Sequence, residues 1–244
     1  MRRLAAAGLV ALAAARLSGQ AAAPYPRAAV DHARYHEHLA SDVVSRSGAA
    51  TVHRRLDREA GYAVFRLGDS VVVSADTLRM TAVTGSDTTQ LDTSGFVGGR
   101  WHLLLTADGR AQVFERPFVP GVLAEVNDLG AAMDDFFPRR PPELAVGAAG
   151  TDLLGWQWRR LADSGAAQRY RWSERQTFDS VRAAGDSVRI PVHQQSTETG
   201  SLAWRQDAGP LAWHREIATT VATKVGNRTI EATVTETITV RRLR

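Results

Sequence analysis

Three histidines near the N-terminus, His32, His36 and His38, are the first residues whose types could do chemistry. Neutral imidazole binds Zn²⁺ and Cu²⁺ well, so such a cluster could hold a catalytic metal ion. On a helix His32 and His36 share a face and His38 points about 160° away from His36, whereas on a strand all three share a face. The spacing is not the H-E-x-x-H pattern of zinc proteases. His32 and His36 are therefore the candidate ligands of a remote alternative, a metal-dependent hydrolase, and we expect no bound metal.

Aromatic residues form the second candidate site, around a predicted hairpin turn at Asp163-Ser164-Gly165. A three-residue loop with Gly165 in the left-handed conformation would place Trp156 opposite Trp172 and Trp158 opposite Tyr170. Cross-strand aromatic pairs stabilise a sheet, and Trp and Tyr also line apolar pockets while keeping one polar atom available. The candidate ligand-binding residues are Trp156, Trp158, Tyr170 and Trp172. Packing in the core is the alternative role for them.

The sequence lacks the motifs of the common catalytic and nucleotide-binding sites. It has no Cys, no G-x-S-x-G motif around a nucleophilic Ser, and no glycine-rich loop with the spacing that cradles phosphates. We therefore expect a non-enzymatic protein without a cofactor.

The N-terminus has the layout of a secretory signal peptide. Arg2 and Arg3 precede an apolar run over residues 4–15, and small residues follow at 18–23. This run is too short to cross a bilayer, which takes about 20 residues. We expect residues 1–23 to be removed by cleavage near residues 21–23, which leaves a periplasmic or secreted protein of bacterial type.

The basic character of the chain is smaller in the expected mature protein than in the full sequence. The formal net charge is +4 at pH 7, and three of these positive charges belong to Arg2, Arg3 and Arg16 in the segment expected to be removed. The mature chain is therefore close to neutral. No basic stripe interleaved with aromatic residues stands out in the sequence. We do not expect a nucleic acid as a partner.

Beyond residue 48 apolar and polar residues alternate, which predicts antiparallel strands joined by hairpins. Asp108-Gly109 marks one turn. The last hairpin is the clearest, because Gly226-Asn227 closes it with Val225 opposite Arg228. The first of these hairpins would place Trp101, Leu103, Leu105 and Phe114 on one face. The last would place Trp213, Ile217, Val221, Val225, Ile230, Val234, Ile238 and Val240 on its apolar face, with Glu236 diagonal to Arg215.

Two segments favour helices. Residues 24–48 carry small and apolar residues at helical spacing before Gly48, so we expect an N-terminal helix or a flexible segment there. Residues 120–142 begin with Pro120 and carry apolar residues at steps of three and four until a Pro-rich turn. This pattern predicts an amphipathic helix over residues 120–137. It would link a first antiparallel half, residues 49–119, to a second, residues 151–244.

Several stretches resemble uncharacterised bacterial exported proteins that are grouped as domains of unknown function. They are Asp92-Thr-Ser-Gly-Phe-Val-Gly-Gly-Arg-Trp101, Phe136-Phe-Pro-Arg-Arg-Pro-Pro142 leading to Val146-Gly147, and the closing Thr-rich hairpin. Such proteins are similar in turn to the half-open β-barrels, with a capping helix, of periplasmic lipoprotein carriers and lipid-binding lipoproteins. The resemblance implies a curved sheet wrapped around residues 120–137. Many of these proteins carry a lipidated Cys, which this chain lacks.

These patterns predict a mainly β (α+β) protein. We expect a curved antiparallel sheet or half-barrel of long hairpins, in one or two lobes, with an amphipathic helix packed on its apolar face. The first functional hypothesis is an exported, non-enzymatic module that binds a lipid or other apolar ligand, or a cell-envelope protein. The alternative is a structural or protein-interaction module with a fully packed core. A ligand carrier needs a connected cavity of at least about 300 Å³ between sheet and helix.

Overall fold

The structure is a computed structural model that describes residues 25–243, except residues 108, 125–128, 185–187 and 226–227. The expected signal peptide over residues 1–23 and the tip of the last hairpin therefore lie outside the described residues. Among the residues that are described, no helix is long and apolar enough to cross a membrane.

Strands make up most of the described chain. They are β1 (Ala33–Ser47), β2 (Ala50–Leu67), β3 (Ser70–Thr84), β4 (Asp87–Leu91), β5 (Arg100–Leu105), β6 (Ala111–Glu115), β7 (Ala149–Thr151), β8 (Gln157–Ser164), β9 (Ala167–Ala184), β10 (Val188–Arg205), β11 (Gly209–Val225) and β12 (Arg228–Leu243). Helical structure in this part of the chain is limited to α1 (Gly121–Ala124) and two short 3₁₀ helices, η1 (Arg27–Ala29) and η2 (Leu129–Ala131).

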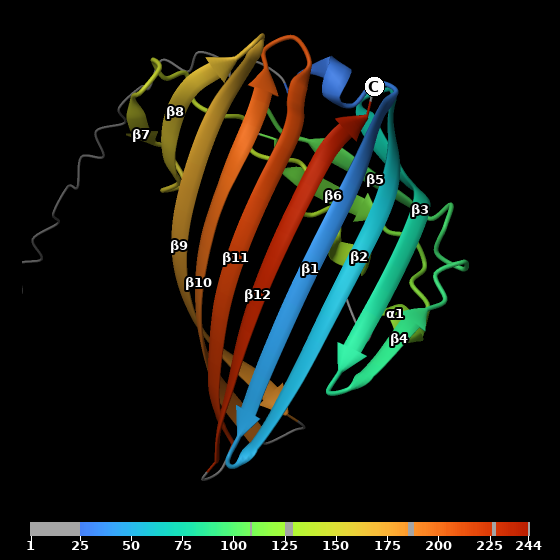
Figure 1. The fold of residues 1–244 in the computed structure, drawn as a ribbon, viewed down its shortest axis with the longest axis vertical. Coiled ribbons are helices and arrows are strands. Elements are labelled where there is room, and N and C mark those ends of the chain that lie inside the picture. The colour runs from blue at the N-terminus through green and yellow to red at the C-terminus, as the bar shows by residue number, and fades with distance from the viewer. Residues whose placement is uncertain (1–24, 108, 125–128, 185–187, 226–227, 244) are drawn as a thin grey trace, which may run out of the picture.

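The strands form one 12-stranded antiparallel sheet in the order β6-β5-β3-β2-β1-β12-β11-β10-β9-β8-β7, and β4 pairs with β3 beside this path. Figure 1 shows the long strands lying side by side in a curved sheet, with the segment between β6 and β7 behind them. The prediction of a curved antiparallel sheet is confirmed, and the sheet is open and continuous, so it is not divided into two lobes.

β1 lies at the centre of the sheet, because it pairs with β2 on one side and with β12 on the other. The helix expected within residues 24–48 is therefore wrong. Every second side chain of β1 from Ala33 to Ser41 is buried. This period of two was not visible in the sequence, because one of the buried residues is the charged Glu37. The Nε atom of Arg58, on β2, donates a hydrogen bond to the Glu37 carboxylate at 2.8 Å, which makes that burial tolerable.

One face of the sheet, here called the inner face, carries the hydrophobic core. Phe136, from the segment behind the sheet, meets the rings of Tyr35, Tyr62 and Trp213 at centroid distances of 5.7, 5.1 and 5.5 Å. All three contacts are edge to face, a geometry that adds roughly 0.5–1.5 kcal/mol per pair beyond the burial of area. The core is thus an aromatic layer between the sheet and this segment.

The connecting segment, residues 116–148, does not form the amphipathic helix expected over residues 120–137. Its helical residues are limited, among those described, to α1 and η2. Of the apolar positions on which the prediction rested, those whose side chains the structure describes are nevertheless buried against the inner face, while Val122 and Val126 lie outside that description. The buried ones are Leu123, Leu129, Met133, Phe136 and Phe137.

Side chains of the sheet explain why this segment is not a helix. Trp101 Nε1 donates to the carbonyl oxygen of Gly130 at 3.0 Å, and Arg215 Nη1 donates to that of Asp135 at 2.8 Å. A backbone whose carbonyls are satisfied by the sheet has less need of helical hydrogen bonds. Gly121 and Gly130 also lower the helix propensity of the segment by about 1 kcal/mol each.

The hairpin registers were predicted with mixed success. In the last hairpin Val225 pairs with Arg228, as predicted. In the first, Leu103 pairs with Val113, one residue away from the predicted register. Phe114 is therefore 60% exposed and does not share the face of Leu103. The cause is a bulge between His102 and Leu103, together with a turn wider than two residues.

Replacement of Phe136 tests whether the connecting segment completes the core. Phe136→Ala should lower the free energy of unfolding by about 3–5 kcal/mol, because it leaves a cavity among three aromatic rings. Phe118→Ala, at a side chain that is 82% exposed on the same segment, should change it by less than about 0.5 kcal/mol. Urea unfolding followed by tryptophan fluorescence measures both. Equal effects of the two changes would contradict the assignment.

Alkaline pH should destabilise the fold. Burial raises the pKa of Tyr25, Tyr35 and Tyr62 above the usual value of 10.0. Since the folded state keeps these phenols neutral, their contribution is complete below pH 10 and is lost as the pH rises through the raised values. The free energy of unfolding should fall steadily above about pH 10. Tyr62→Phe, which removes a buried hydroxyl with no hydrogen-bond partner in the described chain, should reduce that fall. A free energy of unfolding that stays constant to pH 11 would contradict this.

Candidate ligand-binding site

Two neighbouring cavities lie where the connecting segment meets the inner face. The first has a volume of about 390 Å³ and is lined by Phe137, Trp156, Trp172 and the pair Glu198 and Arg215, among others. The second has a volume of about 170 Å³ and shares Arg215 with the first. The first exceeds the roughly 300 Å³ that small-molecule sites need.

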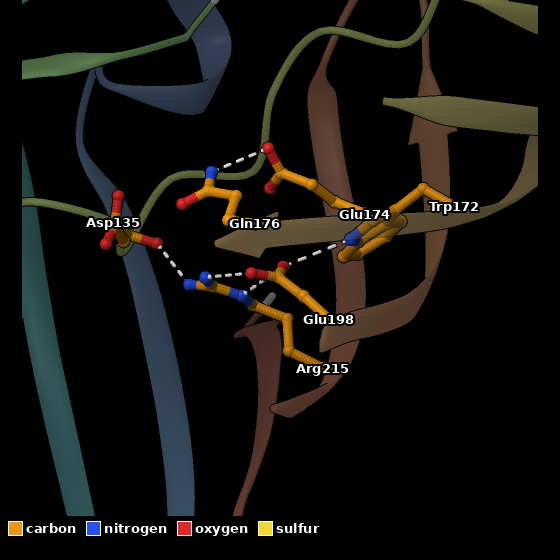
Figure 2. A network of polar contacts seen from close by, with 6 residues as sticks. All are labelled: Asp135, Trp172, Glu174, Gln176, Glu198 and Arg215. Atoms are coloured by element: carbon orange, nitrogen blue, oxygen red, sulfur yellow. Dashed lines mark hydrogen bonds and ion pairs between the residues drawn. The ribbon is translucent and has the colours of Figure 1, made fainter. Parts of the chain in front are cut away.

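Glu198 on β10 and Arg215 on β11 form the polar wall of the first cavity (Figure 2). Arg215 Nε and Nη2 donate to the two carboxylate oxygens of Glu198, each at 2.9 Å. The indole Nε1 of Trp172 donates to the same carboxylate at 3.1 Å. Burial by itself lowers the pKa of Arg215, but the hydrogen bonds and charge of Glu198 outweigh it and raise that pKa above its usual value. The guanidinium is therefore permanently charged and held in one orientation.

A glycine allows Trp172 to reach this carboxylate. Trp172 on β9 pairs with Gly200 on β10. A Cβ atom at Gly200 would lie 2.1 Å from Cζ2 of the indole, so any other residue would displace the ring. The indole consequently lies flat across β10 and directs its Nε1 toward Glu198.

A second buried ion pair, between Glu37 and Arg58, lines the second cavity. The two atoms Arg58 Nη2 and Glu37 Oε1 are 2.7 Å apart, and both side chains are almost completely buried. Glu236 lines the same cavity from β12. The register places Ile217 opposite Glu236, which confirms the predicted position of Glu236 diagonal to Arg215. The carboxylate that holds Arg215 is nevertheless that of Glu198.

Sequence reasoning missed Glu198, since β10 carries no alternation of apolar residues around it. The run from His193 to Thr199 is polar throughout, because its inner-face positions border the cavity instead of the core. A Glu on β10 flanked by Thr gives no signal of burial. The useful signal is the isolated Gly200 within a strand, which indicates the close approach of another group.

The four candidate aromatic residues all lie on the inner face and are buried. Their pairing is shifted by two residues, since Trp158 lies opposite Trp172 and Arg160 lies opposite Tyr170. A shift of two keeps every side chain on its face. It arises because the turn lies at Gly165-Ala166, with Ser164 paired to Ala167, instead of in the predicted three-residue loop at residues 163–165. The irregularity between Leu161 and Ser164 then moves the register back by one residue. Trp156 and Trp172 line the first cavity. Trp158 contacts Tyr170 edge to face at 6.3 Å in the core.

The histidines near the N-terminus lie away from the cavities. His36 and His38 belong to β1 at outer-face positions, and His32 precedes the strand with its side chain 89% exposed. His38 Nε2 lies 3.0 Å from Asp57 Oδ2. In the part of the chain that the structure describes, no group of three or more metal-binding side chains is arranged to hold an ion.

Beyond the row of Glu198 and Glu236, the inner face continues toward the hairpin tips. Its apolar side chains are half-buried or exposed; Val52 is 49% and Phe178 is 61% exposed. The register places Phe178, Gln194, Val221 and Ala232 in one row across four strands. We call this region the open inner face. Its apolar residues are Val43, Val52, Phe178, Val192, Val221, Ile230, Ala232 and Val234.

Removal of one partner of the Glu37–Arg58 pair should strongly destabilise the folded protein. Glu37→Gln should lower the free energy of unfolding by about 3–5 kcal/mol, because it leaves a buried guanidinium without its counter-charge. Glu59→Gln, which removes an exposed carboxylate 3.5 Å from Arg79, should cost less than about 1 kcal/mol. Chemical unfolding at pH 7 measures both variants. A Glu37→Gln protein as stable as the parent would refute the buried pair.

Comparisons with known proteins find a similar fold but no matching family. No protein-family model matches the chain, and no curated protein matches it. A solved structure of lipovitellin, determined to describe lipid–protein interactions in that protein, matches with a TM-score of 0.53 at 8% sequence identity. The match covers 88% of this chain and 25% of the lipovitellin chain. The chain thus resembles, in fold alone, about a quarter of lipovitellin.

Proposed function

We propose that this protein binds an apolar or amphiphilic ligand of lipid type on the inner face of its sheet, without catalysing a reaction. The observation that carries the proposal is the open inner face, where apolar side chains of six strands, interspersed with polar ones such as Ser45 and Gln194, remain accessible to solvent. Exposed apolar surface gains about 25 cal/mol for each Å² that a ligand covers. An accessible surface that combines apolar side chains with small polar ones can take up an amphiphilic ligand.

The first cavity supports an amphiphile over a plain hydrocarbon. Its residues include the apolar rings of Phe137, Trp156 and Trp172 and the charged pair Glu198 and Arg215. Glu174, whose carboxylate accepts a hydrogen bond from Gln176 Nε2 at 2.7 Å, adds a further polar group on β9 (Figure 2). Ligand sites commonly combine apolar walls with a few fixed polar groups that orient the ligand. The apolar part of the ligand would cover the open inner face, and its polar end would lie in the cavity.

The likeness to lipovitellin supports the same ligand class, because that protein was described through its lipid–protein interactions. The resemblance of the sequence to bacterial exported proteins of half-barrel type points in the same direction. We propose accordingly that the protein acts outside the cytoplasm, after removal of residues 1–23, on a lipid or another cell-envelope component.

Two neighbouring residues of β12 provide a matched test. Val234 faces the open inner face, and Thr233 faces the outer side. Val234→Glu should weaken the binding of a dansylated fatty acid at least tenfold, because it places a carboxylate where the acyl chain would lie. Thr233→Glu, with the same change of charge, should stay within twofold of the parent. Fluorescence titration measures both dissociation constants. A parent protein that does not bind the probe, or equal losses in the two variants, would contradict the proposal.

A further inference from the structure

Two leucines project from the turn between β7 and β8. The side chain of Leu153 is fully exposed, and that of Leu154 is 49% exposed. The two residues occupy the centre of the turn over residues 152–155. Neither leucine belongs to the hydrophobic core. Turns of this kind are usually built from polar residues, so two leucines here are unusual.

Hydrogen bonds to the carboxylate of Asp152 hold the turn that carries these leucines. Oδ1 of Asp152 accepts hydrogen bonds from the backbone N–H groups of Leu154 and Trp156 at 2.9 and 3.0 Å. Oδ2 accepts one from the indole of Trp158 at 3.1 Å. Gly155 closes the turn with a φ of +88°, a conformation that favours glycine. The fold therefore presents the leucines in a fixed place.

A cluster of arginines lies beside this turn on the outer face of β8 and β9. Arg159 and Arg171 are directly opposite each other in the register. Like charges in this arrangement destabilise a sheet. Arg169 and Arg175 follow on the same face of β9, all four are exposed, and no carboxylate pairs with them in the described chain. The cluster does not stabilise the folded sheet, and its positive charge favours an anionic binding partner.

The cluster, the leucines and the first cavity share one edge of the molecule. The pairing of β8 with β9 ends at Gln157 and Ser173, two residues after the turn and two residues before Arg175. Trp156, directly after the turn, lines the first cavity. A flat surface that touches this edge from the outer side would meet the apolar tip and the positive charges together.

We propose that this edge docks on the surface of an anionic lipid bilayer. Leu153 and Leu154 enter the boundary between headgroups and acyl chains, as apolar side chains of peripheral proteins do. Arg159, Arg169, Arg171 and Arg175 bind the anionic headgroups, where guanidinium groups pair well with phosphate. The membrane contact uses residues outside the proposed ligand site and does not depend on it.

Vesicle sedimentation with the full chain tests the proposal. The parent protein should bind vesicles of phosphatidylglycerol and phosphatidylcholine, bind pure phosphatidylcholine at least tenfold more weakly, and lose binding as the salt concentration rises. The double variant Leu153→Ser/Leu154→Ser and the double variant Arg159→Gln/Arg171→Gln should each lower the partition coefficient at least tenfold.

The matched controls remove the same kinds of side chain at sites away from this edge. Phe118→Ser removes another exposed apolar residue, and Arg34→Gln/Arg55→Gln removes two exposed charges on β1 and β2; both should stay within twofold of the parent. Binding of the dansylated fatty acid without vesicles should be unchanged in the leucine variant, which separates this proposal from the ligand site. Vesicle binding that is absent, or that is equally strong with neutral lipid, would overturn the proposal. The proposal would also be overturned if the arginine cluster bound an oligonucleotide and the Leu153→Ser/Leu154→Ser variant bound it as well as the parent.

Discussion

A single antiparallel sheet is stable only when one of its faces lies against other apolar groups, and this requirement organises the whole protein. The strands at its centre have 15 to 18 residues, which makes them about 50–60 Å long. The connecting segment covers the inner face at one end, where Phe136 and Phe137 meet the aromatic residues of the sheet. The open inner face is the part of this surface that the chain leaves accessible.

Two buried ion pairs mark the border between the covered and the open parts. The Glu37–Arg58 and Glu198–Arg215 pairs satisfy their own charges, so they can lie beside the aromatic core without a solvent shell. They also keep the cavities at this border polar on one side. Arg215 in addition holds the carbonyl of Asp135 in the connecting segment. The same side chains that anchor the cover thus shape the proposed ligand site.

Features that depend on local sequence pattern were predicted correctly, whereas features that depend on contacts between distant residues were not. The last hairpin was predicted in the correct register, because its alternation persists over more than ten residues around Gly226-Asn227. The helix over residues 120–137 failed, because Trp101 and Arg215 hold its carbonyls in an irregular path. β1 was missed because Glu37 interrupts its apolar face. Trp156 and Trp172, two of the four predicted ligand-binding candidates, line the first cavity. Glu198 and Arg215 became a pair only when β10 and β11 came together.

Native mass spectrometry tests the central claim, that the inner face holds a lipid-type ligand, most directly. The protein would be purified without detergent or organic solvent from cells that produce it. The account predicts an additional mass of lipid size that disappears after organic extraction and returns when the extracted lipid is added back. A bare protein mass, unchanged by the addition of that lipid or of a fatty acid, would contradict it.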